Sequence, residues 1–288
     1  MTAADARAQT VEEFAPAKIN LTLHVTGQRP DGYHLLDSLV VFADLGDRIT
    51  VRRAGHLGLR VTGPMASGVP VDSSNLVLRA AAAIGIAGAE ITLDKHLPAA
   101  AGIGGGTSDA AAALRALRRS HGASPLSDEQ ILQLGADMPV CMGAVSARMS
   151  GIGEQVTVVP GIPALAAVLI NPGVSVQTPD AFHALSDKSG RRMPAIPAFR
   201  DAAACCGWLK EQRNDLQAPV ARMVPAVAQV LETLRGTGAE IARMSGSGAT
   251  CFGLYPTRER AETVARTLSR DHPGWWIRAT TLASRGTC

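Results

Sequence analysis

Apolar and polar residues follow two different periods along the first half of the chain. Segments 17–25, 48–53 and 90–93 are rich in β-branched and other apolar residues and have the pattern of strands. Segments 76–86 and 110–119 are rich in alanine, with apolar residues at helical spacing. The first half of the chain is therefore predicted to mix α-helices with β-strands.

A second series of elements begins after a turn-rich stretch at residues 160–163. A short strand pattern at 156–159 ends there, and the next strand is predicted at 165–170. Helices are predicted near 218–234 and 258–270. We therefore predict two domains, residues 1–162 and 163–288.

Residues 186–198 have the composition of an exposed loop. They contain Gly190, two prolines and a cluster of four charged residues. The composition does not decide whether this loop closes over a site.

The composition is that of a folded globular protein. The 288 residues are 46% hydrophobic and 18% charged, which fits about two ordinary domains. A net charge of +3 with 3% aromatic residues is too weak a bias for a nucleic-acid partner. The start of the chain lacks a signal-peptide pattern, and the longest apolar run, 164–170, is too short to cross a bilayer. We expect a cytoplasmic protein that binds neither nucleic acid nor membrane.

Five cysteines, Cys141, Cys205, Cys206, Cys251 and Cys288, form no metal-binding spacing. Their odd number also argues against a closed set of disulfides. We expect reduced thiols.

Four glycines stand within the five positions 102–106 of the segment PAAAGIGGGTSDAAA, residues 98–112. Bare backbone after a strand and before a helix lets N–H groups converge on an anion, and the helix N-terminus favours negative charge. Thr107 and Ser108 could add hydroxyl donors, or one of them could help hold Mg²⁺. The alternative is a simple turn that starts a helix, with Ser108 or Asp109 as N-cap. The spacing fits neither a P-loop nor the dinucleotide-binding GxGxxG pattern.

Three polar residues elsewhere are candidates for chemistry. Lys18 and Asn20 lie two positions apart on a predicted strand and so face the same side. A single strand lysine is more often solvated, however. Asp137 precedes Pro139 in a predicted turn, where an aspartate commonly serves only to shape the turn. Neither the strand with Lys18 and Asn20 nor the turn with Asp137 identifies a reaction by itself.

These segments together resemble the GHMP kinase superfamily. Residues 98–108 match its P-x-x-x-G-x-G-G-G-[ST]-S motif. PAKINL (16–21) and GADMPV (135–140) match A-K-[IL]-N and G-A-D-[VMI]-P of the branch that phosphorylates 4-diphosphocytidyl-2-C-methyl-D-erythritol. RNDLQAP (213–219) and MSGSGATCFGLY (244–255) resemble two further motifs of this branch, in the same order.

The resemblance implies that ATP and Mg²⁺ are used. Asp137 would accept the proton of the substrate hydroxyl as that oxygen attacks the γ-phosphorus, and Lys18 would orient Asp137 and offset the developing negative charge. Asn75 would contact the adenine, although it could equally cap its own helix. The ATP-binding residues implied are Asn75, Pro98, Ala99, Ala100, Ala101, Gly102, Ile103, Gly104, Gly105, Gly106, Thr107 and Ser108.

The tetrad DGYH, residues 31–34, suits recognition of a nucleobase. A phenol can stack on a pyrimidine while an imidazole binds its edge. The alternative is a D-G turn with a half-buried tyrosine. The resemblance implies that Tyr33 and His34 hold the cytosine and that Asn20 contacts the methylerythritol. It also places Thr178 near the substrate and Phe182 on the other face of the base, although helix capping and core packing explain these two equally well.

The resemblance further implies an α+β fold of two domains. The N-terminal α/β domain would carry the glycine-rich phosphate loop, the C-terminal domain would be ferredoxin-like, and the active site would lie in the cleft between them. Two alternatives stay open: a kinase of another small alcohol, such as homoserine or mevalonate, and a non-catalytic metabolite sensor of the same fold. DGYH and GADMP argue against the first, and the presence of both Lys18 and Asp137 argues against the second. The oligomeric state is not decided.

Overall fold

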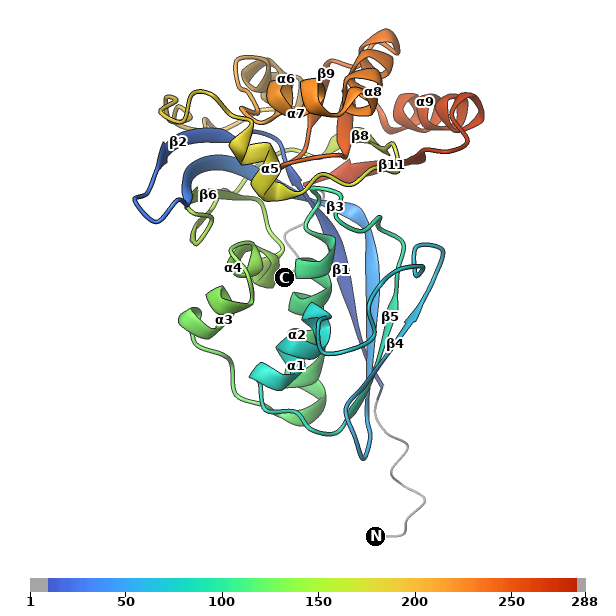
Figure 1. Cartoon of the computed structure of the whole chain (residues 1–288). Coiled ribbons are helices and arrows are strands. Elements are labelled where there is room, and N and C mark those ends of the chain that lie inside the picture. Colours follow the sequence, from blue (N-terminus) through green and yellow to red (C-terminus); the bar gives the residue numbers. More distant parts are fainter. Residues whose placement is uncertain (1–9, 284–288) are drawn as a thin grey trace. The chain divides into compact units, whose positions relative to one another are not determined.

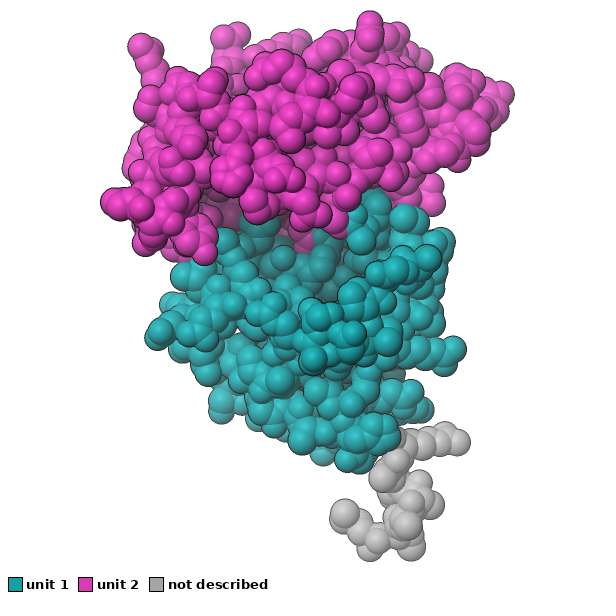
Figure 2. Space-filling view, in the orientation of Figure 1, with its two compact units in different colours: residues 1–17, 46–99, 105–143 teal, residues 18–45, 100–104, 144–288 magenta. Residues whose placement is uncertain are grey.

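The structure, a computed structural model, describes residues 10–283, which form two compact units (Figure 2). Within these residues, unit 1 consists of 10–17, 46–99 and 105–143, and unit 2 consists of 18–45, 100–104 and 144–283. The units are therefore interleaved along the chain. The sequence predicted one boundary after residue 162, and that linear division stays a prediction.

Unit 1 packs helices against strands that the alternating pattern predicts. Strand β5 pairs antiparallel with residues 48–53 of β3, and β4 pairs parallel with β5. Apolar side chains of β3 and β5, including Ile49 and Ile91, form one buried cluster with alanines of α1 and α2. The elements are β1 Val11–Asn20, β3 His34–Arg53, β4 Gly58–Thr62, α1 Leu76–Ala83, β5 Ala89–Asp94, α2 Gly105–His121, α3 Asp128–Leu134 and α4 Met138–Gly143. Residues 18–20 of β1 and 34–45 of β3 belong to unit 2.

Unit 2 contains a four-stranded antiparallel sheet in the order β11-β8-β10-β9. This order, with helices after β8 and α9 between β10 and β11, is that of a ferredoxin-like fold, as predicted. Helix α9 packs on β8 and β11, and α8 packs on β9 and β10 (Figure 1). The elements are β8 Leu165–Asn171, α5 Thr178–His183, α6 Ala202–Lys210, α7 Gln217–Met223, α8 Pro225–Gly236, β9 Ile241–Met244, β10 Cys251–Tyr255, α9 Arg258–Asp271 and β11 Trp276–Leu282.

A smaller group of strands in unit 2 surrounds the first part of β3. Its members are β2 His24–Gln28, β6 Ala147–Gly151 and β7 Gln155–Val158. Strands β2 and β6 both pair antiparallel with β3, and β7 pairs with β6. Strand β3 therefore carries the residues that follow the DGYH turn through the middle of this group.

One predicted helix is wrong in its extent. The segment 218–234 forms two helices, α7 and α8, which are separated at Val224. Pro225 is the first residue of α8, where its missing N–H costs no helical hydrogen bond, whereas inside a continuous helix it would remove one. Residues 186–198 form no helix or strand, as predicted, although Met193 within them is buried.

The cysteines within residues 10–283 form no disulfide. Cys141, Cys205, Cys206 and Cys251 are buried reduced thiols, which confirms the prediction for these four. Cys288 lies outside the described residues. Among the helices of residues 10–283, none has the length and apolar character needed to cross a bilayer.

A buried group of three charges holds both flanks of the glycine-rich segment in unit 1. The Lys95 ammonium donates to carboxylates of Asp47 and, at 2.7 Å, of Asp109 on α2. Asp47 also accepts from the backbone N–H groups of His96 and Leu97, at 2.6 and 2.8 Å. Burial raises the pKa of Asp109, and the nearby Asp47 carboxylate raises it further, although the Lys95 ammonium acts in the opposite direction. The segment entering the loop and the helix leaving it are thereby tied to one cation.

We expect Lys95→Met to destabilise the protein strongly. The substitution leaves two carboxylates buried without their cation, a change that typically costs about 3 to 5 kcal/mol. Urea unfolding followed by circular dichroism measures the free energy of unfolding. Arg52→Met is the control, because Arg52 pairs with Glu90 on the surface and its loss should leave that free energy nearly unchanged. Equal urea-unfolding midpoints for the two variants would contradict the role of Lys95 as the cation that balances the two buried carboxylates.

Candidate active site

The first half of the glycine loop, residues 100–104, follows a path in unit 2 that requires glycine. Gly102 and Gly104 have φ of 70° and 62°. A Cβ on Gly102 would lie 2.6 Å from the carbonyl oxygens of Ser245 and Gly248. Because real side chains do not approach backbone so closely, only glycine fits here. The loop lies directly against the turn at 245–248.

Lys18 lies beside this half of the loop. Its backbone N–H donates to the Ile103 carbonyl at 2.9 Å, and a Cβ on Gly104 would lie 3.2 Å from the Lys18 Cβ. Lys18 is also 5% exposed, so it is not the solvated strand lysine of the alternative interpretation. The structure thus brings together Lys18 and the glycine motif, which are more than 80 residues apart in the sequence.

The second half of the loop opens helix α2 in unit 1. The helix begins at Gly105, so the interpretation of Ser108 or Asp109 as its N-cap is wrong. Ser108 is buried and its hydroxyl donates to the Pro16 carbonyl at 2.8 Å, while Asp109 binds Lys95. Gly106 is exposed, and a Cβ at this position would meet no other segment of the described chain within 4 Å. The exposed start of a 17-residue helix is suited to bind an anion.

Asp137 lies in the turn that precedes α4 in unit 1, as predicted. Its carbonyl accepts from Cys141 N–H at 3.1 Å, which supports the first turn of that helix. Lys18 belongs to unit 2, so the approach of Lys18 to Asp137 stays a prediction.

Asn20 is buried in unit 2 with one amide atom satisfied. Its Nδ2 donates to the Ser38 hydroxyl at 2.8 Å, and its backbone N–H donates to Ser245 at 3.1 Å. Its Oδ1 has no hydrogen-bond partner within residues 10–283. Asn20 therefore lies between strand β3, through Ser38, and the turn at 245–248, which is called the glycine turn below.

His34 and Phe182, two residues predicted to bind the substrate, contact each other in unit 2. Their rings stack with centroids 4.6 Å apart and planes 20° apart. The pKa of His34 is lowered by burial and then by the positive charges of Lys188 and His183, so the imidazole is neutral near pH 7. Its Nε2 is buried and finds no partner among the described residues. Tyr33, by contrast, is 60% exposed, so it is not the half-buried tyrosine of the alternative interpretation.

Thr178 is the first residue of α5 and does not cap it, since the N-cap is Gln177. Its hydroxyl instead lies 2.9 Å from the hydroxyl of Ser247 in the glycine turn. Helix α5 therefore carries Phe182 to the His34 ring and Thr178 to the turn.

Asn75 is the N-cap of α1, and its side chain accepts from Val77 N–H at 2.9 Å. The capping interpretation of this residue is therefore confirmed. Its contact with adenine stays a prediction.

Sequence reasoning missed an ion pair in unit 2 between the buried Asp37 and the partly buried Arg148. Both carboxylate oxygens of Asp37 accept from the Arg148 guanidinium, at 2.7 and 2.6 Å. The same pair binds the backbone of Met193 through its N–H and its carbonyl, at 3.0 and 2.7 Å. The pair thus fixes the middle of the 186–198 loop. No motif signalled it, because the three residues come from separate segments.

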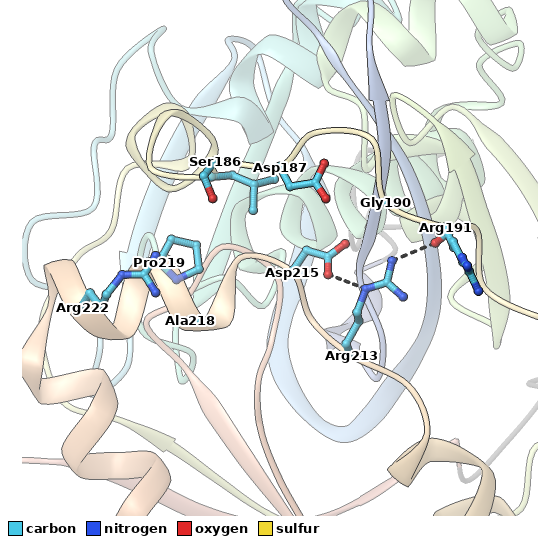
Figure 3. Close-up of a pocket in the computed structure, with 10 residues that line it drawn as sticks. Ser186, Asp187, Gly190, Arg191, Arg213, Asp215, Ala218, Pro219 and Arg222 are labelled. Atoms are coloured by element: carbon cyan, nitrogen blue, oxygen red, sulfur yellow. Dashed lines mark hydrogen bonds and ion pairs between the residues drawn. The ribbon is translucent and has the colours of Figure 1, made fainter.

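A cavity of about 440 Å³ lies elsewhere on unit 2. Figure 3 shows Arg213 between Asp215 and the Arg191 carbonyl, which are its partners at 2.5 and 2.8 Å. None of the site residues predicted from the sequence lines this cavity. Within residues 10–283, no group of three His, Cys, Asp or Glu side chains could hold a metal ion by itself.

Comparison with known proteins agrees with this geometry. Residues 75–160 match the GHMP kinase N-terminal domain, and residues 193–274 match the GHMP kinase C-terminal domain. A 4-diphosphocytidyl-2-C-methyl-D-erythritol kinase of Dinoroseobacter shibae is 55% identical over 93% of this chain and 94% of its own length. One of Paramagnetospirillum magneticum is 46% identical over 94% and 98%.

Solved structures give the same result. A crystal structure of 4-(cytidine 5'-diphospho)-2C-methyl-D-erythritol kinase is 34% identical, with a TM-score of 0.80 over 95% of this chain and all of that one. Homoserine kinase from Cytophaga hutchinsonii shares the fold at 18% identity, with a TM-score of 0.68 over 99% of each chain. The chain belongs to the GHMP kinase family.

Proposed function

We propose that this chain transfers the γ-phosphoryl group of ATP to the 2-hydroxyl of 4-diphosphocytidyl-2-C-methyl-D-erythritol. The products are the 2-phosphate and ADP, a step of non-mevalonate isoprenoid synthesis that takes place in the cytoplasm. The observation that carries the proposal is identity above 50%, over more than nine-tenths of this chain, to several kinases of that name. The placement of Lys18 beside the glycine loop supports it.

In the proposed reaction the alcohol oxygen attacks the γ-phosphorus and its proton passes to the Asp137 carboxylate. The bond between the γ-phosphorus and the bridging oxygen breaks, and ADP leaves. Lys18 orients Asp137 and offsets the charge that develops on the phosphoryl oxygens. The chain's contribution is thus to position the reactants and to stabilise charge.

The nucleotide phosphates bind the bare backbone of the loop and the N-terminus of α2. Mg²⁺, when bound, neutralises part of the phosphate charge and takes most of its ligands from phosphates and water. Thr107 fits as a protein ligand because it is partly exposed at the start of α2. Ser108 fits less well, because its buried hydroxyl already donates to Pro16.

Asp137→Asn should lower kcat by about 10² to 10⁴, because an amide cannot accept the proton. The ATP affinity should stay close to that of the wild type, since the phosphates bind elsewhere. Steady-state kinetics and calorimetric titration with ATP measure the two quantities. The exposed Asp128→Asn on α3 is the matched control and should keep full activity. Near wild-type kcat in Asp137→Asn would rule out this mechanism.

Phe182→Ala should raise KM for the cytidine substrate about tenfold or more, because stacking on a base contributes about 1 to 3 kcal/mol. KM for ATP should not change. Phe199→Ala is the control, because Phe199 packs edge-on against Trp208 and not on His34. An equal rise in both KM values would argue against a cytosine site at this ring.

Release of ADP in the presence of each candidate alcohol tests the proposed function itself. Turnover with the cytidine substrate, and not with homoserine or mevalonate, is the expected result. A preference for either small alcohol would support a different specificity in the same family. A protein that binds ATP and the cytidine substrate without releasing ADP would be a sensor.

A further inference from the structure

The glycine turn at 245–248 and the adjoining Thr250 form hydrogen bonds to the glycine loop, residues 100–104, within unit 2. The Thr250 N–H donates to the Ala101 carbonyl at 3.1 Å, and the Ser245 hydroxyl donates to the Gly102 carbonyl at 3.0 Å. The path of residues 101–102 therefore depends on where this turn lies.

Ser245 also joins the loop to strand β1. Its oxygen accepts from the Asn20 N–H at 3.1 Å while its single hydrogen is given to Gly102. Because Ser245 is fully buried, water does not replace these bonds. A shift of the turn would thus move the loop relative to the strand that carries Lys18.

Asn214, from the RNDLQAP segment, holds the turn in place. Its Nδ2 donates to the carbonyls of Met244 and Gly246, at 2.8 and 2.9 Å, and these two residues flank Ser245. Its Oδ1 accepts from the Leu216 N–H at 3.0 Å, just before α7. Both amide hydrogens and the amide oxygen are used, and the residue is only 7% exposed. The side chain is therefore fixed in one orientation.

The neighbours of Asn214 do not share this role. Arg213 and Asp215 bind each other and line the cavity of Figure 3, away from the turn. Gln217, the first residue of α7, adds another bond to the turn by accepting from the Met244 N–H at 2.9 Å. The RNDLQAP segment thus contacts the turn through two amide side chains.

We propose that Asn214 is a positioning residue for nucleotide binding: by donating to both carbonyls that flank Ser245, it sets the turn that holds the phosphate loop at Gly102. The inference rests on the proposed function, because the bound anion is the triphosphate of ATP. Asn214 touches neither substrate nor reacting atoms and acts through Ser245.

Asn214→Asp separates this role from the local turn that Asn214 forms with the Leu216 N–H. The carboxylate keeps an acceptor for the Leu216 N–H but replaces two donated hydrogen bonds by repulsion from two carbonyls. Calorimetric titration with ATP and Mg²⁺ at pH 8 should show affinity at least about tenfold weaker in both Asn214→Asp and Asn214→Ala. KM for ATP should rise accordingly, while KM for the cytidine substrate stays within about twofold.

Ser245→Ala tests the next link and should weaken ATP binding about threefold to tenfold, since it removes the bond to Gly102. If an Asn214 variant does not fold, the ATP affinity of Ser245→Ala still tests the proposal. Asp201→Ala is the control: Asp201 caps α6 through the Ala204 N–H and has no bond to the turn. It should lower the melting temperature and leave ATP affinity unchanged.

The outcomes separate this inference from the proposed function. Wild-type protein that does not bind ATP would overturn both. Wild-type affinity in Asn214→Asp, with only Asn214→Ala impaired, would show that only the bond to the Leu216 N–H matters and would overturn the inference alone. Unchanged ATP affinity in a folded Ser245→Ala would overturn it as well.

Discussion

Two stretches of backbone, the glycine loop at Gly102 and the turn at 245–248, approach each other more closely than any side chain would allow, and the geometry of the site in unit 2 follows from this approach. A single Cβ on Gly102 would come within 2.6 Å of two carbonyl oxygens. Without that atom, backbone and one serine hydroxyl can bond across the gap. The absence of a side chain therefore does two things at once, because it brings the loop against the turn and leaves its amides bare for an anion.

Charged groups also fix the local geometry within each unit. In unit 1 the ammonium of Lys95 ties the segment before the loop to the helix after it. In unit 2 the Asp37–Arg148 pair holds the 186–198 loop by the backbone of Met193. Because an unpaired charge is costly in a buried setting, each of these networks favours one local geometry.

The fold leaves the substrate undecided. Homoserine kinase and mevalonate kinase share it at 18% and 15% identity, with TM-scores of 0.68 and 0.66. In unit 2 of this chain the rings of His34 and Phe182, from strand β3 and helix α5, stack on each other, and we propose that they bind the cytosine. A neutral imidazole whose Nε2 has no hydrogen-bond partner among residues 10–283 suits the edge of a base and offers little to a small amino acid.

Residue order alone was enough to predict the local features of this protein: the mixed helices and strands, the loop at 186–198, the turn that carries Asp137 and the glycine motif. Periodicity, glycine and proline act within a few positions of themselves, which is why these features can be predicted without a fold. Local exceptions were the break at Pro225, which the apolar pattern of 218–234 concealed, the start of α2 at Gly105, and the interruption of the strand predicted at 17–25 between β1 and β2. The meeting of distant residues became visible only in the folded chain. Lys18 beside Gly104, Phe182 on His34, Ser245 on Gly102 and Asn214 on the glycine turn all join segments far apart in the chain. The packing of a whole unit sets such contacts, and no local pattern encodes them.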